Sequence, residues 1–146
     1  MSKVAIQGNA SGTGTFTIAA PNSNSNRTLT LPDADGTIAT AGATTTWTAP
    51  QRGTVTTDND LSFDMNVTNN FKCTPTATGA LTFTNITAGQ SGYVLLVNSG
   101  GYAITAAATT KVGATFLSTV SAAGTYLISY MTDGTNVYCT ASGALS

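Results

Sequence analysis

The chain has 146 residues, with five Lys or Arg, six Asp, no Glu and no His, and its formal net charge is −1. This composition lacks the clustered positive charge that binds nucleic acid, and it lacks the imidazole and Glu side chains on which most acid–base catalysis depends. The longest aliphatic run, residues 94–97, is too short to span a membrane, and the N-terminus has no apolar core of a secretory signal. We therefore expect a non-enzymatic protein of cytoplasmic origin with no cofactor, no metal, and neither nucleic acid nor membrane as a partner.

Thr accounts for thirty of the residues, and Gly for 15. The β-branched Thr side chain suits a pleated, half-wet surface, and Gly supplies tight turns. Long straight-chain helix formers are scarce. The composition thus predicts an all-β fold.

Residues 1–50 are expected to form an extended arm with short strands over 14–21, 26–33 and 36–40, each ended by Pro, Gly or Asp. Ordering an arm of this length costs on the order of 1 kcal/mol per residue, whereas burying one large apolar side chain returns roughly 1.5–3 kcal/mol. We therefore expect the arm to dock on other subunits; an arm that is simply disordered is the alternative. The six large apolar side chains predicted to make this inter-subunit interface are Phe16, Ile18, Leu29, Leu31, Ile38 and Trp47.

The strand over 26–33 is the clearest docking element of the arm. Leu29 and Leu31 alternate with Thr28 and Thr30. An extended segment of this kind can add to an exposed sheet edge of another chain, with its alternate side chains in pockets.

Residues 51–146 are denser in apolar side chains and predict a compact antiparallel β domain. Leu61, Phe63, Met65 and Val67 alternate on one face of a strand. Gly-rich turns at 99–101 and 133–134 predict two hairpins. Short strands at close spacing are typical of a β-sandwich or jelly-roll-like domain, and the Ala-rich stretch 106–124 favours loops and strands over a helix.

Cys73 and Cys139 each fall on the apolar face of an alternating strand, which predicts buried, reduced thiols. A disulfide is the alternative. Asp58, Asp60 and Asp64 could offer oxygen ligands to Ca²⁺, but the Gly and the terminal Glu of an EF-hand loop are missing, so a polar turn before a strand is the preferred interpretation.

The five tyrosines have two interpretations. They could stack on a sugar or a base, but packing in the domain and at its rim is favoured. They are Tyr93, Tyr102, Tyr126, Tyr130 and Tyr138.

Two stretches resemble modules of tailed-bacteriophage virion proteins. The segment 14–40, "GTFTIAAPNSNSNRTLTLPDADGTIAT", is similar to a virion module with a Gly-Thr-Phe-Thr strand and an Asn-Arg-Thr-Leu-Thr-Leu-Pro-Asp strand. The second half, from "GALTFTNITAGQ" to "MTDGTNVYCTASGALS", resembles a β domain of phage tail fibres and head proteins. Neither motif is catalytic.

The resemblance implies a virion structural protein, often a homotrimer. One arm and one compact domain best suit a head decoration (cement) protein that bridges capsomers and contacts the major capsid protein and neighbouring subunits. A subunit of a short tail or collar fibre is the alternative, and a carbohydrate-binding module comes third. The implied location is the virion, after synthesis in the host cytoplasm.

Overall fold

The computed structural model describes residues 8, 10–15, 17–19, 22–28 and 50–146. The chain divides into two units, Met1–Thr45 and Thr46–Ser146. The strands and the single helix found among the described residues all belong to the second unit. They are β1 (Val55–Thr57), β2 (Ser62–Asp64), β3 (Asn70–Cys73), β4 (Gly79–Thr84), β5 (Ser91–Asn98), β6 (Ile104–Ala106), β7 (Thr110–Val112), α1 (Phe116–Ser121), β8 (Gly124–Thr132) and β9 (Val137–Ala141).

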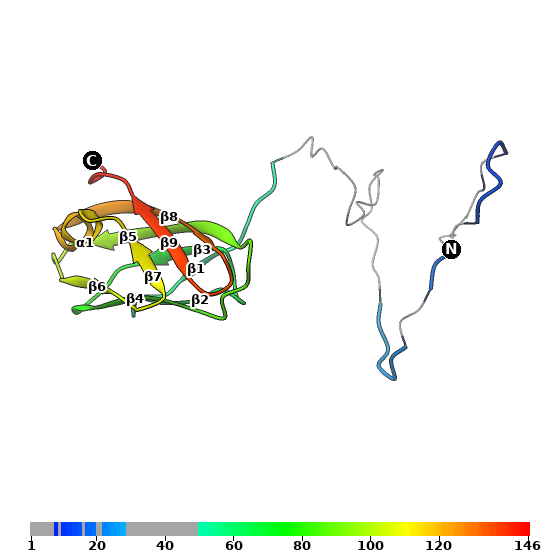
Figure 1. Cartoon of the computed structure of the whole chain (residues 1–146), viewed down its shortest axis with the longest axis horizontal. Helices are drawn as coiled ribbons and strands as arrows, with labels where there is room; N and C mark the ends of the chain where they lie inside the picture. Colours follow the sequence, from blue (N-terminus) through cyan, green and yellow to red (C-terminus); the bar gives the residue numbers. More distant parts are fainter. Residues whose placement is uncertain (1–7, 9, 16, 20–21, 29–49) are drawn as a thin grey trace, which may run out of the picture. The chain divides into compact units, whose positions relative to one another are not determined.

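The strands form two sheets (Figure 1). One has six strands in the order β1-β3-β5-β8-β9-β7, and the other has three in the order β2-β4-β6. The first six strands alternate between the sheets, so the chain winds in successive coils, and neighbouring coils pair in parallel. The all-β prediction is therefore confirmed.

The finer prediction, an antiparallel sandwich or jelly-roll-like domain, is wrong. The domain is a β-solenoid whose six-stranded sheet is completed by the antiparallel pairs β5–β8 and β8–β9 and the parallel pair β7–β9. The predicted hairpin at Asp133-Gly134 is confirmed, because Thr132 and Val137 face each other across it. Gly134 has φ of 93°, a left-handed conformation that Gly adopts without steric cost.

The hairpin predicted at 99–101 is also wrong, and the buried Asn98 explains why. Its side-chain amide donates to the carbonyls of Tyr102 and Val120 at 2.9 Å each, and its Oδ1 accepts from the Tyr102 N–H at 2.9 Å. These bonds hold the loop after β5 against α1. The next strand, β6, then enters the three-stranded sheet instead of returning beside β5.

The core lies between the two sheets. Tilted aromatic pairs join Phe63 to Phe71, Phe63 to Phe83, and Phe83 to Tyr130, with ring centroids 5.0, 5.4 and 4.9 Å apart. Such pairs stabilise a fold by about 0.5–1.5 kcal/mol beyond the area that they bury. Strands of both sheets thus contribute to one aromatic cluster.

Other predictions for this domain have mixed outcomes. Leu61 and Met65 are buried together with Phe63, as predicted, but Val67 is 60% exposed because the strand ends at Asp64 and a turn follows. The helix α1 lies within the stretch predicted to lack one. It buries Phe116 and Val120, and this packing overrides the weak helix propensity of its Ser and Thr residues.

Cys73 and Cys139 are buried with free thiols, which confirms the prediction. Burial raises the pKa of the Cys73 thiol to about 11 and that of Cys139 to about 12. Both thiols are therefore protonated near neutral pH and poorly reactive.

The strand predicted over 14–21 is not found at its described positions, 14–15 and 17–19. A lone extended segment has only water as a partner for its backbone groups, so it gains nothing by holding a strand conformation. Most of the other two predicted arm strands lies outside the described residues, and the part that is described, 26–28, is not a strand.

Candidate interaction face

The outer face of the six-stranded sheet carries side chains that alternate with those of the core. In β5 the side chains of Val94 and Leu96 point inward, so Tyr93 and Leu95 point outward. The side chains of β8 alternate between the core and the outer face in the same way. The strand register then aligns the outward residues in rows across the sheet. One row contains Val55, Asn70, Tyr93 and Ser129; the next contains Thr57, Lys72, Leu95 and Leu127.

Large apolar side chains that remain exposed in residues 50–146 gather on this outer face. Seven are exposed in this range, and five of them belong to the outer face: Val55, Tyr93, Leu127, Met131 and Tyr138. Single exposed apolar residues are ordinary on protein surfaces, but a contiguous group is typical of an interaction site. The clustering makes this face the candidate functional site.

The face has two shallow apolar hollows. The first, of about 320 Å³, is lined by Val55, Asn70, Phe71, Tyr93, Leu95 and Leu127. We call it the β1 hollow, because Val55 of the edge strand β1 forms one of its walls. The second, of about 410 Å³, is lined by Met131 and Tyr138 with their neighbours on β8 and β9. Neither contains a carboxylate or an amine, so both suit apolar contacts better than chemistry.

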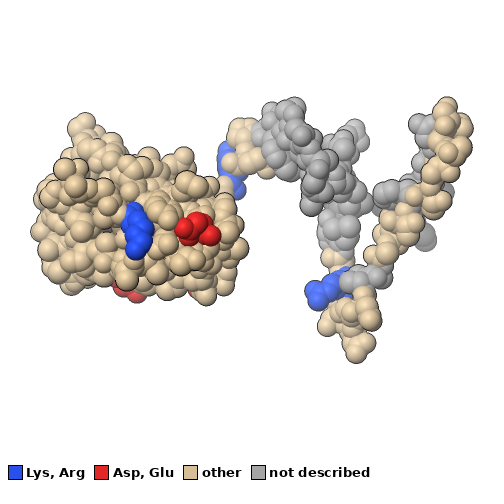
Figure 2. Space-filling view, in the orientation of Figure 1, with Lys and Arg blue, Asp and Glu red and all other residues tan. Residues whose placement is uncertain are grey.

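Charge on the domain is sparse, as Figure 2 shows for the face that it presents. Lys72 and Lys111 are exposed on the outer face of the six-stranded sheet, and the Lys111 Nζ donates to the carbonyl of Ala108 at 2.7 Å. Asp133 accepts hydrogen bonds from the Thr135 and Asn136 backbone N–H groups and from the Tyr138 hydroxyl, at 2.7–2.8 Å. These bonds fix the β8–β9 turn and one edge of the second hollow.

The Asp133 hydrogen bonds, first that from the Asn136 N–H, lower the pKa of this carboxyl from 3.8 to about 2. A pKa that is lower in the folded state means that ionised Asp133 stabilises the fold above about pH 4 and that this contribution is lost as the pH falls through 2. We expect the melting temperature of Asp133→Asn to fall less between pH 5 and pH 2 than that of the wild type. Asp58→Asn is the control. Burial raises the pKa of Asp58, so removing this carboxyl cannot reduce the fall of the melting temperature between pH 5 and pH 2. Parallel profiles for Asp133→Asn and the wild type would contradict this role.

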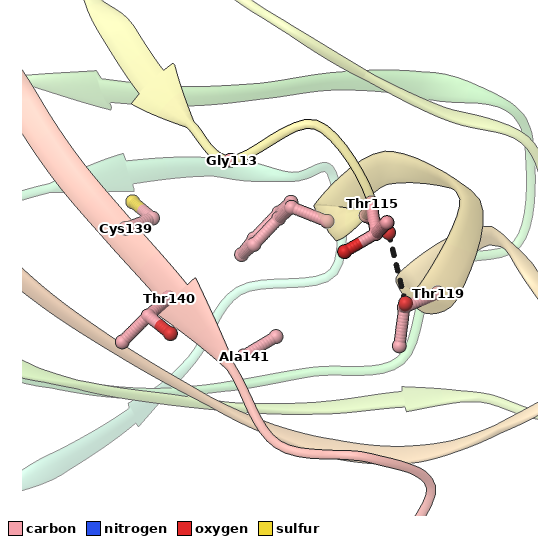
Figure 3. Close-up of a pocket in the computed structure, with 7 residues that line it drawn as sticks. Gly113, Thr115, Thr119, Cys139, Thr140 and Ala141 are labelled. Atoms are coloured by element: carbon pink, nitrogen blue, oxygen red, sulfur yellow. Dashed lines mark hydrogen bonds between the residues drawn. The ribbon is translucent and has the colours of Figure 1, made fainter.

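A smaller cavity, of about 130 Å³, lies between α1 and β9 (Figure 3). Gly113, Thr115, Phe116 and Thr119 line it on one side, and Cys139, Thr140 and Ala141 on the other. The Thr119 hydroxyl donates to the Thr115 carbonyl at 2.8 Å. The one ionisable group in the lining is the Cys139 thiol, whose pKa of about 12 keeps it protonated, so the cavity has no base to activate a nucleophile.

Asp60 and Asp64 serve as turn residues. Asp60 accepts from the Ser62 N–H at 2.8 Å, and Asp64 accepts from the Asn66 N–H at 2.9 Å and the Asn85 amide at 2.7 Å. The Asn85 bond, followed by that of Asn66, lowers the pKa of Asp64. In the part of the chain that the structure describes, no three His, Cys, Asp or Glu residues are grouped as metal ligands would be.

The six interface residues predicted in the arm fall mostly outside the described part of the chain. Phe16, Leu29, Leu31, Ile38 and Trp47 all lie there. Ile18 is described and is 76% exposed. The role of the six at an inter-subunit interface therefore stays a prediction.

The outer face was not predicted from the sequence, although a signal for it exists. The runs YVLLV (93–97) and YLISYM (126–131) are apolar at nearly every position. Strict alternation indicates one buried face, whereas a nearly continuous apolar run indicates that both faces meet apolar surroundings. Applied to 93–97 and 126–131, this rule would have identified Tyr93, Leu127 and Met131.

No family model, curated protein or solved structure matches this chain. Among the described residues, no helix is long and apolar enough to cross a membrane.

Proposed function

We propose that the chain is a non-enzymatic structural subunit of a phage virion, a head decoration protein that stabilises the capsid by bridging capsomers. The observation that carries this proposal is the apolar outer face of a nearly uncharged β domain. A surface of this kind gains stability when neighbours cover it, as a capsid lattice would. The resemblance of residues 14–40 and of the second half to virion modules supports the same class.

The described cavities also fit a structural role better than an enzymatic one. No acidic, basic or imidazole side chain lines either hollow or the α1–β9 cavity. Enzymatic turnover usually needs such a group, or a metal, beside the bound substrate.

A fibre subunit of a short tail or collar is the second candidate. The parallel coils favour it, because coils of this type bury their faces by stacking and can continue along one axis. Antibody labelling of whole virions separates the two: label on the head supports decoration, and label confined to the tail supports a fibre.

Binding to capsids that lack the native protein tests the role of the arm. We expect the full chain with Leu29→Asp and Leu31→Asp to bind at least tenfold more weakly than the wild type, because charged side chains are costly to bury in apolar pockets. The matched control is Thr28→Asp with Thr30→Asp, which adds the same charge to the opposite face of the predicted strand and should bind nearly as the wild type does. Equal loss in both pairs would mean that added charge, not the Leu face, weakens binding.

A further inference from the structure

The strand β1 forms one edge of the six-stranded sheet. β1 pairs in parallel with β3 and ends the sheet, so its other side has no strand partner among the described residues. An unpaired edge presents backbone groups that can pair with an added strand. Val55 stands on this edge, is 61% exposed and lines the β1 hollow.

The surface beside this edge has a defined pattern along the strand direction. Gly53, two residues before Val55, has no side chain, and a Cβ placed there would lie 2.6 Å from the Asn70 amide nitrogen. Thr57 lies two residues after Val55 and pairs with the exposed Lys72 of β3 in the next row across the sheet. The order is thus a glycine against which the Asn70 amide packs, an apolar position and a cation, each two residues apart. No acidic residue occurs in β1, β3, β5 or β8.

The arm contains a segment with the complementary pattern. Leu29, Leu31 and Asp33 are also two residues apart, which places them on one face of an extended strand. Residues 28–50 include Asp33 and Asp35 but no Lys or Arg. Pro32 suits the outermost strand of a sheet, where its missing N–H leaves no ladder bond unmade.

We propose that residues 29–33 of one copy add as a parallel strand to the β1 edge of a second copy. Leu31 then lies beside Val55 at the β1 hollow, Leu29 lies beside Gly53, and Asp33 falls in the row of Lys72. This register extends the parallel ladder β1-β3-β5 by one strand. The inference rests on the proposed function, since it names the partner of the arm.

A second copy fits this site better than the arm of the same chain. A further coil within one chain would need another strand for the three-stranded sheet. In the coil that follows β1, this strand is β2, which contains the buried Phe63 and is flanked by the buried Leu61 and Met65. Between residue 36 and β1 the large apolar side chains are Ile38 and Trp47, nine residues apart. This spacing does not supply such a strand, which favours a neighbouring copy as the partner of the segment 29–33.

The test is complementation between two full-length variants in solution. One carries Val55→Asp, which damages the receiving edge, and the other carries Leu29→Asp with Leu31→Asp, which damages the arm. Light scattering at micromolar concentration should give about three chains for the wild type, the closed ring that a head-to-tail contact forms when three copies complete one rotation. Each variant alone should give one chain. A 1:1 mixture should give two chains, because one intact arm meets one intact edge.

Val67→Asp is the matched control, because Val67 is 60% exposed and lies in the turn after β2, but it is not among the residues that line the β1 hollow. It should associate as the wild type does, and all variants should keep the wild-type circular dichroism spectrum. Tyr93→Ser provides a second edge variant should Val55→Asp fail to fold. Asp33→Lys alone and Lys72→Asp alone should each weaken association about threefold to tenfold. The two changes combined in one chain swap the charges and should restore association.

A mixture that remains single chains, a wild type that is monomeric, or a Val67→Asp variant as impaired as Val55→Asp would overturn the inference. The assay contains no capsid, so its outcome is separate from that of the proposed function. Association in solution with no label on virions would refute the virion role alone. Capsid binding by a chain that never self-associates would refute the strand exchange alone.

Discussion

Gly92→Ala is expected to lower the free energy of unfolding by about 3 kcal/mol or more, beyond the usual cost of overpacking, because the added atom meets backbone. A Cβ on Gly92 would overlap the carbonyl oxygen of Asn69 and would lie 2.7 Å from its carbon. That oxygen accepts from the Tyr93 N–H at 3.1 Å and from the buried Tyr130 hydroxyl at 2.7 Å. The β3 end of the sheet would therefore have to move, and both hydrogen bonds would be lost. Urea denaturation of the full chain measures the effect.

Gly113→Ala is the control for Gly92→Ala. No atom lies within 4 Å of a Cβ at Gly113, and its φ is not in the left-handed region. Its stability should stay within about 0.5 kcal/mol of the wild type. If the two variants proved equally stable, the chain before β3 could shift at little cost, and the Asn69 contact would not define the fold.

The sequence predicted which segments form strands better than how the strands pair. Alternation placed Leu61, Phe63 and Met65 inside, and they are inside. Alternation is a property of one strand, however, and it is the same in parallel and antiparallel ladders. Pairing depends on where each connection leads. The Gly-Gly turn after β5 permits a hairpin, but the contacts of Asn98 with Tyr102 and Val120 direct the chain to the other sheet.

The candidate site, the outer face of the six-stranded sheet, was not predicted from the sequence, for a related reason. Composition correctly suggested a low-charge surface, but the interface was assigned to the arm alone. The outer face depends on register, which aligns Tyr93 with Ser129 and Leu95 with Leu127 from strands more than thirty residues apart. A sequence pattern shows that Leu127 is apolar; only the pairing shows that it borders the same hollow as Val55.

Asn98→Asp is expected to destabilise the fold by about 3 kcal/mol or more at neutral pH, because it replaces two donated hydrogen bonds with repulsion and buries a charge. Asn98 is fully buried, and its amide donates to the carbonyls of Tyr102 and Val120. A carboxylate has nearly the same shape but cannot donate. Protonation restores one donor, so part of the loss should be recovered as the pH falls to about 4, opposite in sign to the acid effect of Asp133. Asn69→Asp is the control, because that side chain is exposed and the contacts of Asn69 use its backbone carbonyl. Thermal melting of both variants across pH decides the point: a loss for Asn98→Asp no larger than for Asn69→Asp would mean that the β5–β6 loop and α1 hold together without the amide.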